Sequence, residues 1–146
     1  MKKRVAVHDN WATPPELYNK LNDEFDFDFD PCPLCEGEIP DEKDGLKIEW
    51  GERNFVNPPY SRKLKDAFVK KALEESKKGK LCVLLIPVST STVLFHDVIQ
   101  PNAKDIRFLR GRVKFIGINS EGVRVTNKCG QHDSMVVVFD GREDVH

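Results

Sequence analysis

The stretch Asn54-Phe55-Val56-Asn57-Pro58-Pro59-Tyr60-Ser61 combines a short apolar run, a stiff turn and a residue that suits the start of a helix. Pro58 and Pro59 lack backbone N–H groups and have fixed φ angles, so the turn cannot continue a ladder of strand hydrogen bonds. The apolar residues before Asn57 therefore predict a strand that ends there. Ser61 predicts a helix that begins directly after the turn.

The residues that follow predict how this strand is paired. An apolar stripe with helical spacing runs through residues 62–78, and Gly79 suits the end of that helix. Residues 81–88 are apolar throughout, which is typical of a strand buried on both faces. Strand, helix and strand over residues 54–88 predict a βαβ unit, and hence an α/β fold.

The flanking segments extend this unit. Thr13 suits the cap of a helix, with Pro14 as its first residue. The alternation of Phe and Asp over residues 25–30 predicts a strand with Asp30 at its carboxyl end, where open α/β sheets bind ligands. Residues 36–53 are expected to form a loop. Further strands are expected at residues 106–109, 113–118 and 134–139, and some of these C-terminal strands should be antiparallel.

Length and composition limit the classes of protein to consider. The chain has 146 residues, which predicts a single domain over residues 1–146 with one core. No run of about 18 apolar residues is present, so no membrane span is expected, and no apolar signal segment follows the basic N-terminal residues. The four cysteines are therefore expected to be reduced thiols in a cytoplasm.

The charge balance predicts where a polyanion would bind. The formal net charge is −1, so a nucleic-acid partner needs a local basic patch. Arg107, Arg110, Arg112 and Lys114 form the cluster that we expect to contact phosphates. A charged strand edge that only prevents aggregation is the alternative.

The Asn-Pro-Pro-Tyr turn has the chemistry needed to hold a planar amine. The Asn57 side-chain oxygen and the Pro58 carbonyl can accept hydrogens from an exocyclic amino group, while the Tyr60 ring can stack on the ring that carries it. The alternative is a proline-rich turn that only joins a strand to a helix. The four residues by themselves leave both interpretations open.

Several short motifs together resemble the amino-group methyltransferases that use S-adenosylmethionine, and above all the small phage-type, Dam-like DNA N6-adenine methyltransferases. These motifs are Trp11-Ala12-Thr13-Pro14, Phe29-Asp30-Pro31-Cys32, Asp44-Gly45-Leu46 with Trp50, Asn57-Pro58-Pro59-Tyr60-Ser61, and Gly111-Arg112-Val113-Lys114-Phe115. The resemblance implies a minimal Rossmann-like methyltransferase fold with a central mixed, mostly parallel sheet flanked by helices. It also implies S-adenosylmethionine as cofactor, DNA as partner, no metal, and a phage or prophage gene whose product acts in the bacterial cytoplasm. A homo-oligomer is compatible with it.

The resemblance also implies roles for individual residues. The residues that correspond to the catalytic motif are Asn57, Pro58, Pro59 and Tyr60. Those that correspond to the cofactor site are Trp11, Thr13, Pro14, Asp30, Pro31, Cys32, Asp44 and Leu46. Those expected at the substrate are Tyr60, Ser61, Arg110, Arg112, Lys114 and Phe115, with Phe115 as the second ring around a flipped base. The glycine-rich loop of most methyltransferases is absent after Asp30.

Other functions remain open from the sequence. The same turn serves enzymes that methylate cytosine N4, RNA bases or protein glutamine. A non-enzymatic zinc or nucleic-acid binding module could use Cys32, Cys35, Cys129 and His132, although only the first two have the spacing of a zinc knuckle. Cys32 as a covalent nucleophile toward cytosine is disfavoured, because the Asn-Pro-Pro-Tyr turn indicates direct transfer to an amine.

Overall fold

A four-stranded mixed sheet forms the centre of the molecule in the computed structural model, which describes residues 5–6, 12–33, 37–59, 61–118, 124–126 and 133–142. In spatial order its strands are β3 (Arg53–Val56), β4 (Leu81–Pro87), β8 (Ser134–Asp140) and β5 (Asp105–Phe108). β3 pairs in parallel with β4, whereas β8 is antiparallel to both β4 and β5. β3, β4 and β5 therefore run in one direction, which confirms the α/β class and the mixed sheet. The sheet was expected to be mostly parallel. Three of its four strands do point the same way, but two of the three strand pairings are antiparallel because β8 lies between β4 and β5.

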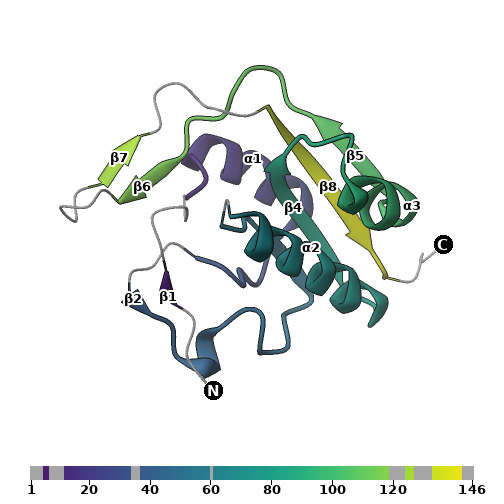
Figure 1. Ribbon diagram of the computed structural model, residues 1–146, viewed down its shortest axis with the longest axis horizontal. Coiled ribbons are helices and arrows are strands. Elements are labelled where there is room, and N and C mark those ends of the chain that lie inside the picture. Colours follow the sequence, from purple (N-terminus) through teal and green to yellow (C-terminus); the bar gives the residue numbers. More distant parts are fainter. Residues whose placement is uncertain are drawn as a thin grey trace.

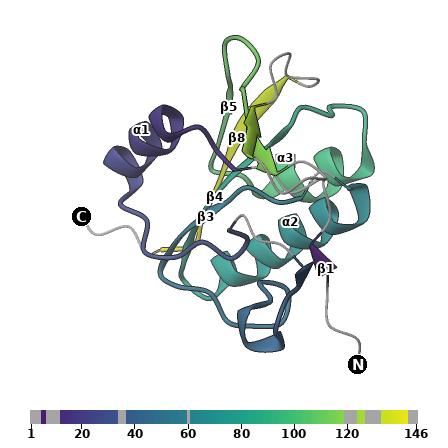
Figure 2. The same ribbon diagram turned by 90° about the vertical axis from the view of Figure 1, so that its left-hand side faces the viewer.

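Helices cover both faces of this sheet. Helix α1 (Pro15–Phe25) lies on one face, and α2 (Arg62–Lys77), the π-helix η2 (Leu94–Ile99) and α3 (Gln100–Asn102) lie on the other. Figure 2 shows α1 and α2 on opposite sides of β3 and β4. In the described part of the chain, no helix is long and apolar enough to cross a membrane.

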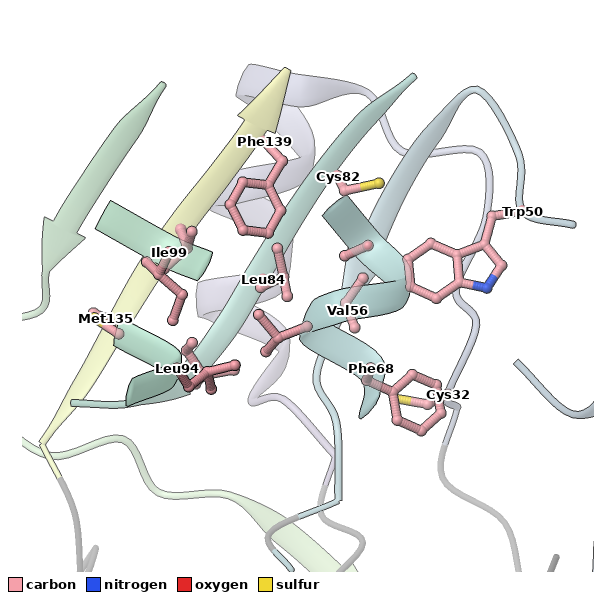
Figure 3. Packing of buried hydrophobic residues seen from close by; sticks show 14 residues of the cluster. Cys32, Trp50, Val56, Phe68, Cys82, Leu84, Leu94, Ile99, Met135 and Phe139 are labelled. Atoms are coloured by element: carbon pink, nitrogen blue, oxygen red, sulfur yellow. The ribbon is translucent and has the colours of Figure 1, made fainter. Parts of the chain in front are cut away.

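The alternation of side chains along β4 explains the two layers of core. Leu81, Val83 and Leu85 pack toward α1, whereas Cys82, Leu84 and Ile86 pack toward α2 and η2. Figure 3 shows the second layer, which includes Phe68 from α2 together with Cys32 and Trp50. Both faces of β4 are thus buried, as its uninterrupted apolar sequence predicts.

Smaller elements surround the sheet (Figure 1). β1 (Val5–Ala6) pairs antiparallel with β2 (Gly37–Glu38), and β6 (Ile116–Ile118) pairs antiparallel with β7 (Arg124–Thr126). The segment expected to be only a loop thus contains β2 and the 3₁₀ turn η1 (Asp41–Lys43). Ala12 forms an antiparallel bridge with Ile116, which fixes the approach to α1 against β6.

The strand expected at residues 25–30 is wrong in its extent. Phe25 closes α1, and Asp26 then adopts a left-handed conformation with φ 53°. The backbone N–H groups of Asp28 and Phe29 both donate to the Arg53 carbonyl, so a regular ladder cannot start there. Only Phe29 pairs with the sheet, through a parallel bridge to Asn54. The alternating burial of Phe and Asp is nevertheless retained through this segment.

A buried ionic network joins α2 to the segment before β3. Glu75 is fully buried, and its Oε1 accepts hydrogen bonds from the Trp50 backbone N–H and, at 3.2 Å, from Lys80 Nζ. Lys78 Nζ lies 2.7 Å from Glu75 Oε2. Burial opposes ionisation of Glu75, but the hydrogen bonds from Lys78, Trp50 and Lys80 outweigh it and lower its pKa to about 2. Glu75 therefore holds Trp50 and the entry to β3 in place.

Candidate active site

The candidate site lies where the parallel strands end. Asn57 directly follows β3, and the parallel bridge between Phe29 and Asn54 brings Asp30 to the same edge of the sheet. This edge at the carboxyl ends of parallel strands is where open α/β sheets commonly bind ligands. The structure thus brings together Asp30 and Asn57, which are separated by a loop and a strand in the sequence.

A cavity of about 300 Å³ opens between α1, the Asp30 turn and the end of β3. Its lining residues are Ala12, Thr13, Pro15, Tyr18, Asn19, Asp30, Cys32, Phe55 and Asn57. Four of the residues expected at the site from the sequence, namely Thr13, Asp30, Cys32 and Asn57, share this lining. The cavity combines aromatic rings with one carboxylate and several neutral polar groups.

The orientation of the Asn57 side chain is fixed by Thr13. Asn57 is 5% exposed, and its Nδ2 donates a hydrogen bond to Thr13 Oγ1 at 3.1 Å. The expected capping role of Thr13 is therefore wrong, since α1 begins at Pro15 with Pro14 in the capping position and no side-chain cap. Because Nδ2 faces Thr13, Oδ1 is the end of the amide that is suited to accept a hydrogen from a substrate amine.

Cys32 links the Asp30 turn to the Asn57 loop. The backbone N–H of Cys32 donates to Asp30 Oδ1 at 2.9 Å, and the Cys32 thiol donates to the Asn57 carbonyl at 2.8 Å. Cys32 is 7% exposed. In this arrangement the thiol holds two loops together at the cavity wall.

The Asp30 carboxyl has an altered affinity for protons. Part of Asp30 is exposed, but protein atoms surround its carboxyl group. The resulting loss of solvation raises the pKa of Asp30 to about 6, although the hydrogen bond from the Cys32 N–H acts in the opposite direction and lowers it. Burial, followed by the nearby Asp30 charge, raises the pKa of the Tyr18 hydroxyl. A positively charged ligand in the cavity would favour the ionised form of Asp30.

The segment around Asp44 packs against Pro31 but does not line the cavity. Asp44 is 1% exposed, and its Oδ1 accepts a hydrogen bond from the Leu46 backbone N–H at 3.0 Å. Trp50 Nε1 donates to the Gly45 carbonyl at 2.7 Å. A Cβ atom on Gly45 would lie 2.1 Å from the Pro31 carbonyl oxygen, so only glycine permits this close approach. Leu46 packs against the core, and Pro31 is buried beside Gly45.

The residues expected to contact the substrate lie in different environments. Arg110 and Lys114 are exposed, and Arg112 Nε lies 3.5 Å from Asp133 Oδ1. Phe115 is 6% exposed and packs in the core beneath α1, so its ring contributes to the fold in this structure.

Arg107, expected in the same cluster, joins α1 to β5. Its guanidinium donates two hydrogen bonds to the Glu24 carboxylate and a third, at 2.8 Å, to Asp105 Oδ2. These hydrogen bonds raise the pKa of Arg107, and the bonds to Glu24 have the larger effect. Three of the guanidinium N–H groups are thus used within the protein.

The remaining residues of the predicted catalytic motif lie just before the start of α2. Pro58 and Pro59 are buried, and the carbonyl of the exposed Ser61 accepts the backbone hydrogen bond of Lys65. Several residues with roles implied by the sequence lie outside the described part of the chain, namely Trp11, Cys35, Tyr60, Cys129 and His132. Their roles stay predictions.

Sequence reasoning missed four lining residues, Pro15, Tyr18, Asn19 and Phe55. Pro15, Tyr18 and Asn19 have the i, i+3, i+4 spacing that places side chains on one helical face. That spacing is the sequence signal that could have identified the three residues from α1. Phe55 packs by its ring edge on Tyr18, with ring centroids 5.2 Å apart.

The sequence matches the family model for DNA N-6-adenine-methyltransferase (Dam) over residues 1–144. It is 37% identical over 109 residues to the DNA N-6-adenine-methyltransferase of Escherichia phage T1, and the match covers 69% of this chain and 44% of the phage protein. The chain thus spans less than half the length of this relative. No solved structure matches the chain. By the match along nearly its whole length, this chain belongs to the DNA N-6-adenine-methyltransferase (Dam) family.

Proposed function

We propose that this protein transfers a methyl group from S-adenosylmethionine to the N6 amine of adenine in DNA. The observation that carries the proposal is the grouping of Thr13, Asp30 and Asn57 around one cavity at the carboxyl ends of parallel strands. Family membership and the phage relative support the same activity. Because DNA is the substrate, the proposed place of action is the cytoplasm of a bacterial host.

The cavity lining suits the proposed cofactor. S-adenosylmethionine supplies, when bound, a methyl group on a positively charged sulfur. Asp30 would balance positive charge on the ligand, while the rings of Tyr18 and Phe55 offer apolar surface and Asn19 offers hydrogen bonds. A volume of about 300 Å³ is at the lower end of the range for small-molecule pockets.

Asn57 is the residue proposed to act on the amine. The N6 lone pair of adenine is delocalised into the ring, which makes the nitrogen a weak nucleophile. An amide oxygen that accepts an N6 hydrogen stabilises the positive charge that grows on the nitrogen as it attacks. Thr13 holds the amide in the required orientation, and Cys32 holds the backbone of Asn57. No covalent intermediate on the enzyme is needed, since alignment of the nitrogen with the methyl group supplies much of the rate.

The substrate must leave the double helix to reach this site. A base inside a duplex cannot enter a cavity at a sheet edge, so the target adenine is expected to be flipped out. Stacking on an aromatic ring replaces part of the stacking that the base had in the duplex. Tyr60 remains the predicted stacking partner, on the evidence of the sequence motif.

Methyl transfer to separate DNA, RNA and protein pools tests the proposed function. Purified protein would be incubated with cofactor that carries a labelled methyl group, and label in each pool would be counted. Label in DNA alone, absent with Asn57→Ala, is the expected result. Label only in RNA or protein would keep the chemistry of amine transfer and overturn the substrate.

A further inference from the structure

A second cavity, of about 480 Å³, lies between α2 and η2. It includes Ser89 and Thr92, which follow the carboxyl end of β4, whereas Asn57 follows the neighbouring parallel strand β3. Arg62, at the start of α2, lines this second cavity and lies five residues after Asn57 in the sequence. Asn57, in the lining of the first cavity, and Arg62, in the lining of the second, are thus close neighbours in the sequence.

The wall that α2 contributes carries three cationic side chains, Arg62, Lys65 and Lys70. Among the described residues, none of the three forms an ion pair with a carboxylate. Asp66 and Asp97 also line the cavity, so the formal charge of its lining is +1. The first turn of α2 contains no acidic residue. Arg62 and Lys65 lie near the N-terminus of α2, where cations oppose the helix dipole, so helix stability does not account for these two side chains.

The opposite wall combines apolar and polar side chains and is firmly held. Val93, Leu94 and Val98 line it beside Asp97, and Val93 is 70% exposed. Thr92 Oγ1 donates to the Ser89 carbonyl at 2.9 Å and accepts from the Phe95 backbone N–H at 3.2 Å. Apolar and hydroxyl side chains that face three cations suit a ligand with anionic groups joined by less polar parts, as in a sugar-phosphate chain.

We propose that this second cavity binds the phosphodiester backbone of the DNA strand next to the flipped adenine, with Arg62, Lys65 and Lys70 on the phosphates. The inference rests on the proposed function for the choice of ligand. It adds a DNA contact on α2 that is separate from the basic cluster before β6. It also gives a near-neutral protein a local positive surface beside its active site.

Salt-dependent DNA binding by the double variant Arg62→Gln/Lys70→Gln tests this proposal. Both residues are exposed, so the fold should tolerate the change. Fluorescence anisotropy with a labelled duplex, without cofactor, gives the slope of log affinity against log salt. The wild-type slope should fall in magnitude by about 0.9 for each phosphate that is no longer neutralised, or about 2 in total. Lys20→Gln/Lys77→Gln removes the same charge from exposed positions away from the cavity and should leave the slope unchanged.

The outcomes separate this inference from the proposed function. An unchanged slope in Arg62→Gln/Lys70→Gln, with adenine methylation intact, would overturn the DNA contact alone. A reduced slope in a protein that methylates no adenine would support the contact and overturn the activity. Failure of the wild-type protein to bind DNA would overturn the contact. Calorimetry with adenosine monophosphate tests one more alternative. If the double variant no longer binds this nucleotide but keeps the wild-type salt slope with duplex DNA, the cavity is a site for a free nucleotide instead.

Discussion

Asn57 Nδ2 donates a hydrogen bond to Thr13 Oγ1 at 3.1 Å, which joins the end of β3 to the residue before the α1 cap. This contact connects two motifs that lie 44 positions apart in the sequence. It means that a threonine on the proposed cofactor side sets the orientation of the amide proposed to act on the substrate.

Thr13→Val tests this positioning role, since valine keeps the shape of threonine but cannot accept the hydrogen bond. The loss of one hydrogen bond typically costs about 0.5–1.5 kcal/mol, so turnover should fall roughly two- to twelvefold. Thr13→Ser keeps the acceptor and should stay near the wild-type rate. Single-turnover kinetics at saturating cofactor measures the effect. Equal losses in the valine and serine variants would contradict the role of the hydrogen bond.

Asp30→Asn tests the charge in the first cavity. The pKa of Asp30 is raised to about 6, so the carboxyl becomes protonated as the pH falls through that value. Affinity for positively charged S-adenosylmethionine should therefore decrease below about pH 6 in the wild type. The asparagine variant should bind at least about tenfold more weakly at pH 7.5, without that dependence. Calorimetry across pH 5 to 8 provides the measurement, and a variant with wild-type affinity would remove Asp30 from the site.

Glu75→Ala should destabilise the fold. It leaves the Trp50 backbone N–H buried without its acceptor and removes one of three acceptors of Lys80, and an unsatisfied buried donor typically costs about 1–3 kcal/mol. The pKa of Glu75 is lowered to about 2, so its contribution is complete above its ordinary pKa and is lost as the pH falls toward 2. Urea unfolding at several pH values should show the variant and wild type converging at low pH. The exposed neighbour Glu74→Ala serves as control, and an equal loss in both variants would argue against the network.

The basic cluster separates into two kinds of residue. Arg107 is held by Glu24 and Asp105, so Arg107→Gln should leave the salt dependence of DNA binding unchanged. Arg110→Glu/Lys114→Glu reverses two exposed charges and should weaken DNA binding, with a flatter salt dependence. Anisotropy titrations compare the two variants directly. Full DNA binding by the double reversal would mean that this strand edge only carries solvated charge.

Local patterns in the sequence predicted most of the central sheet. The uninterrupted apolar run of β4 and the apolar stripe along α2 are both readable from consecutive residues. Both elements were therefore predicted to within a few residues of their bounds. The strand at residues 25–30 failed because the left-handed Asp26 and the shared Arg53 carbonyl are tertiary features without a periodic signal. The strand β7 was not predicted for a similar reason, since three residues give no measurable alternation.

Only some residues of the candidate site could be predicted from the sequence. Asn57 follows an apolar segment and Asp30 ends an alternation of Phe and Asp, and both patterns are visible in the sequence. The role of Thr13 as acceptor for Asn57 was hidden, because its position before two prolines also suits a helix cap. The cations of α2 give no signal of a cavity in the sequence, because charged side chains are common on exposed helix faces. Only the packing of η2 against α2 reveals the second cavity.

The identity of the methylated nucleoside tests the central claim most directly. Duplex DNA would be incubated with the protein and S-adenosylmethionine, digested to nucleosides and analysed by mass spectrometry, with Asn57→Ala in parallel. The account predicts N6-methyladenine from the wild type and at least roughly a hundredfold less from Asn57→Ala, although the variant should still bind cofactor. N4-methylcytosine would keep the mechanism and change the base. A methyl group on carbon 5 of cytosine, or wild-type turnover by Asn57→Ala, would contradict the account.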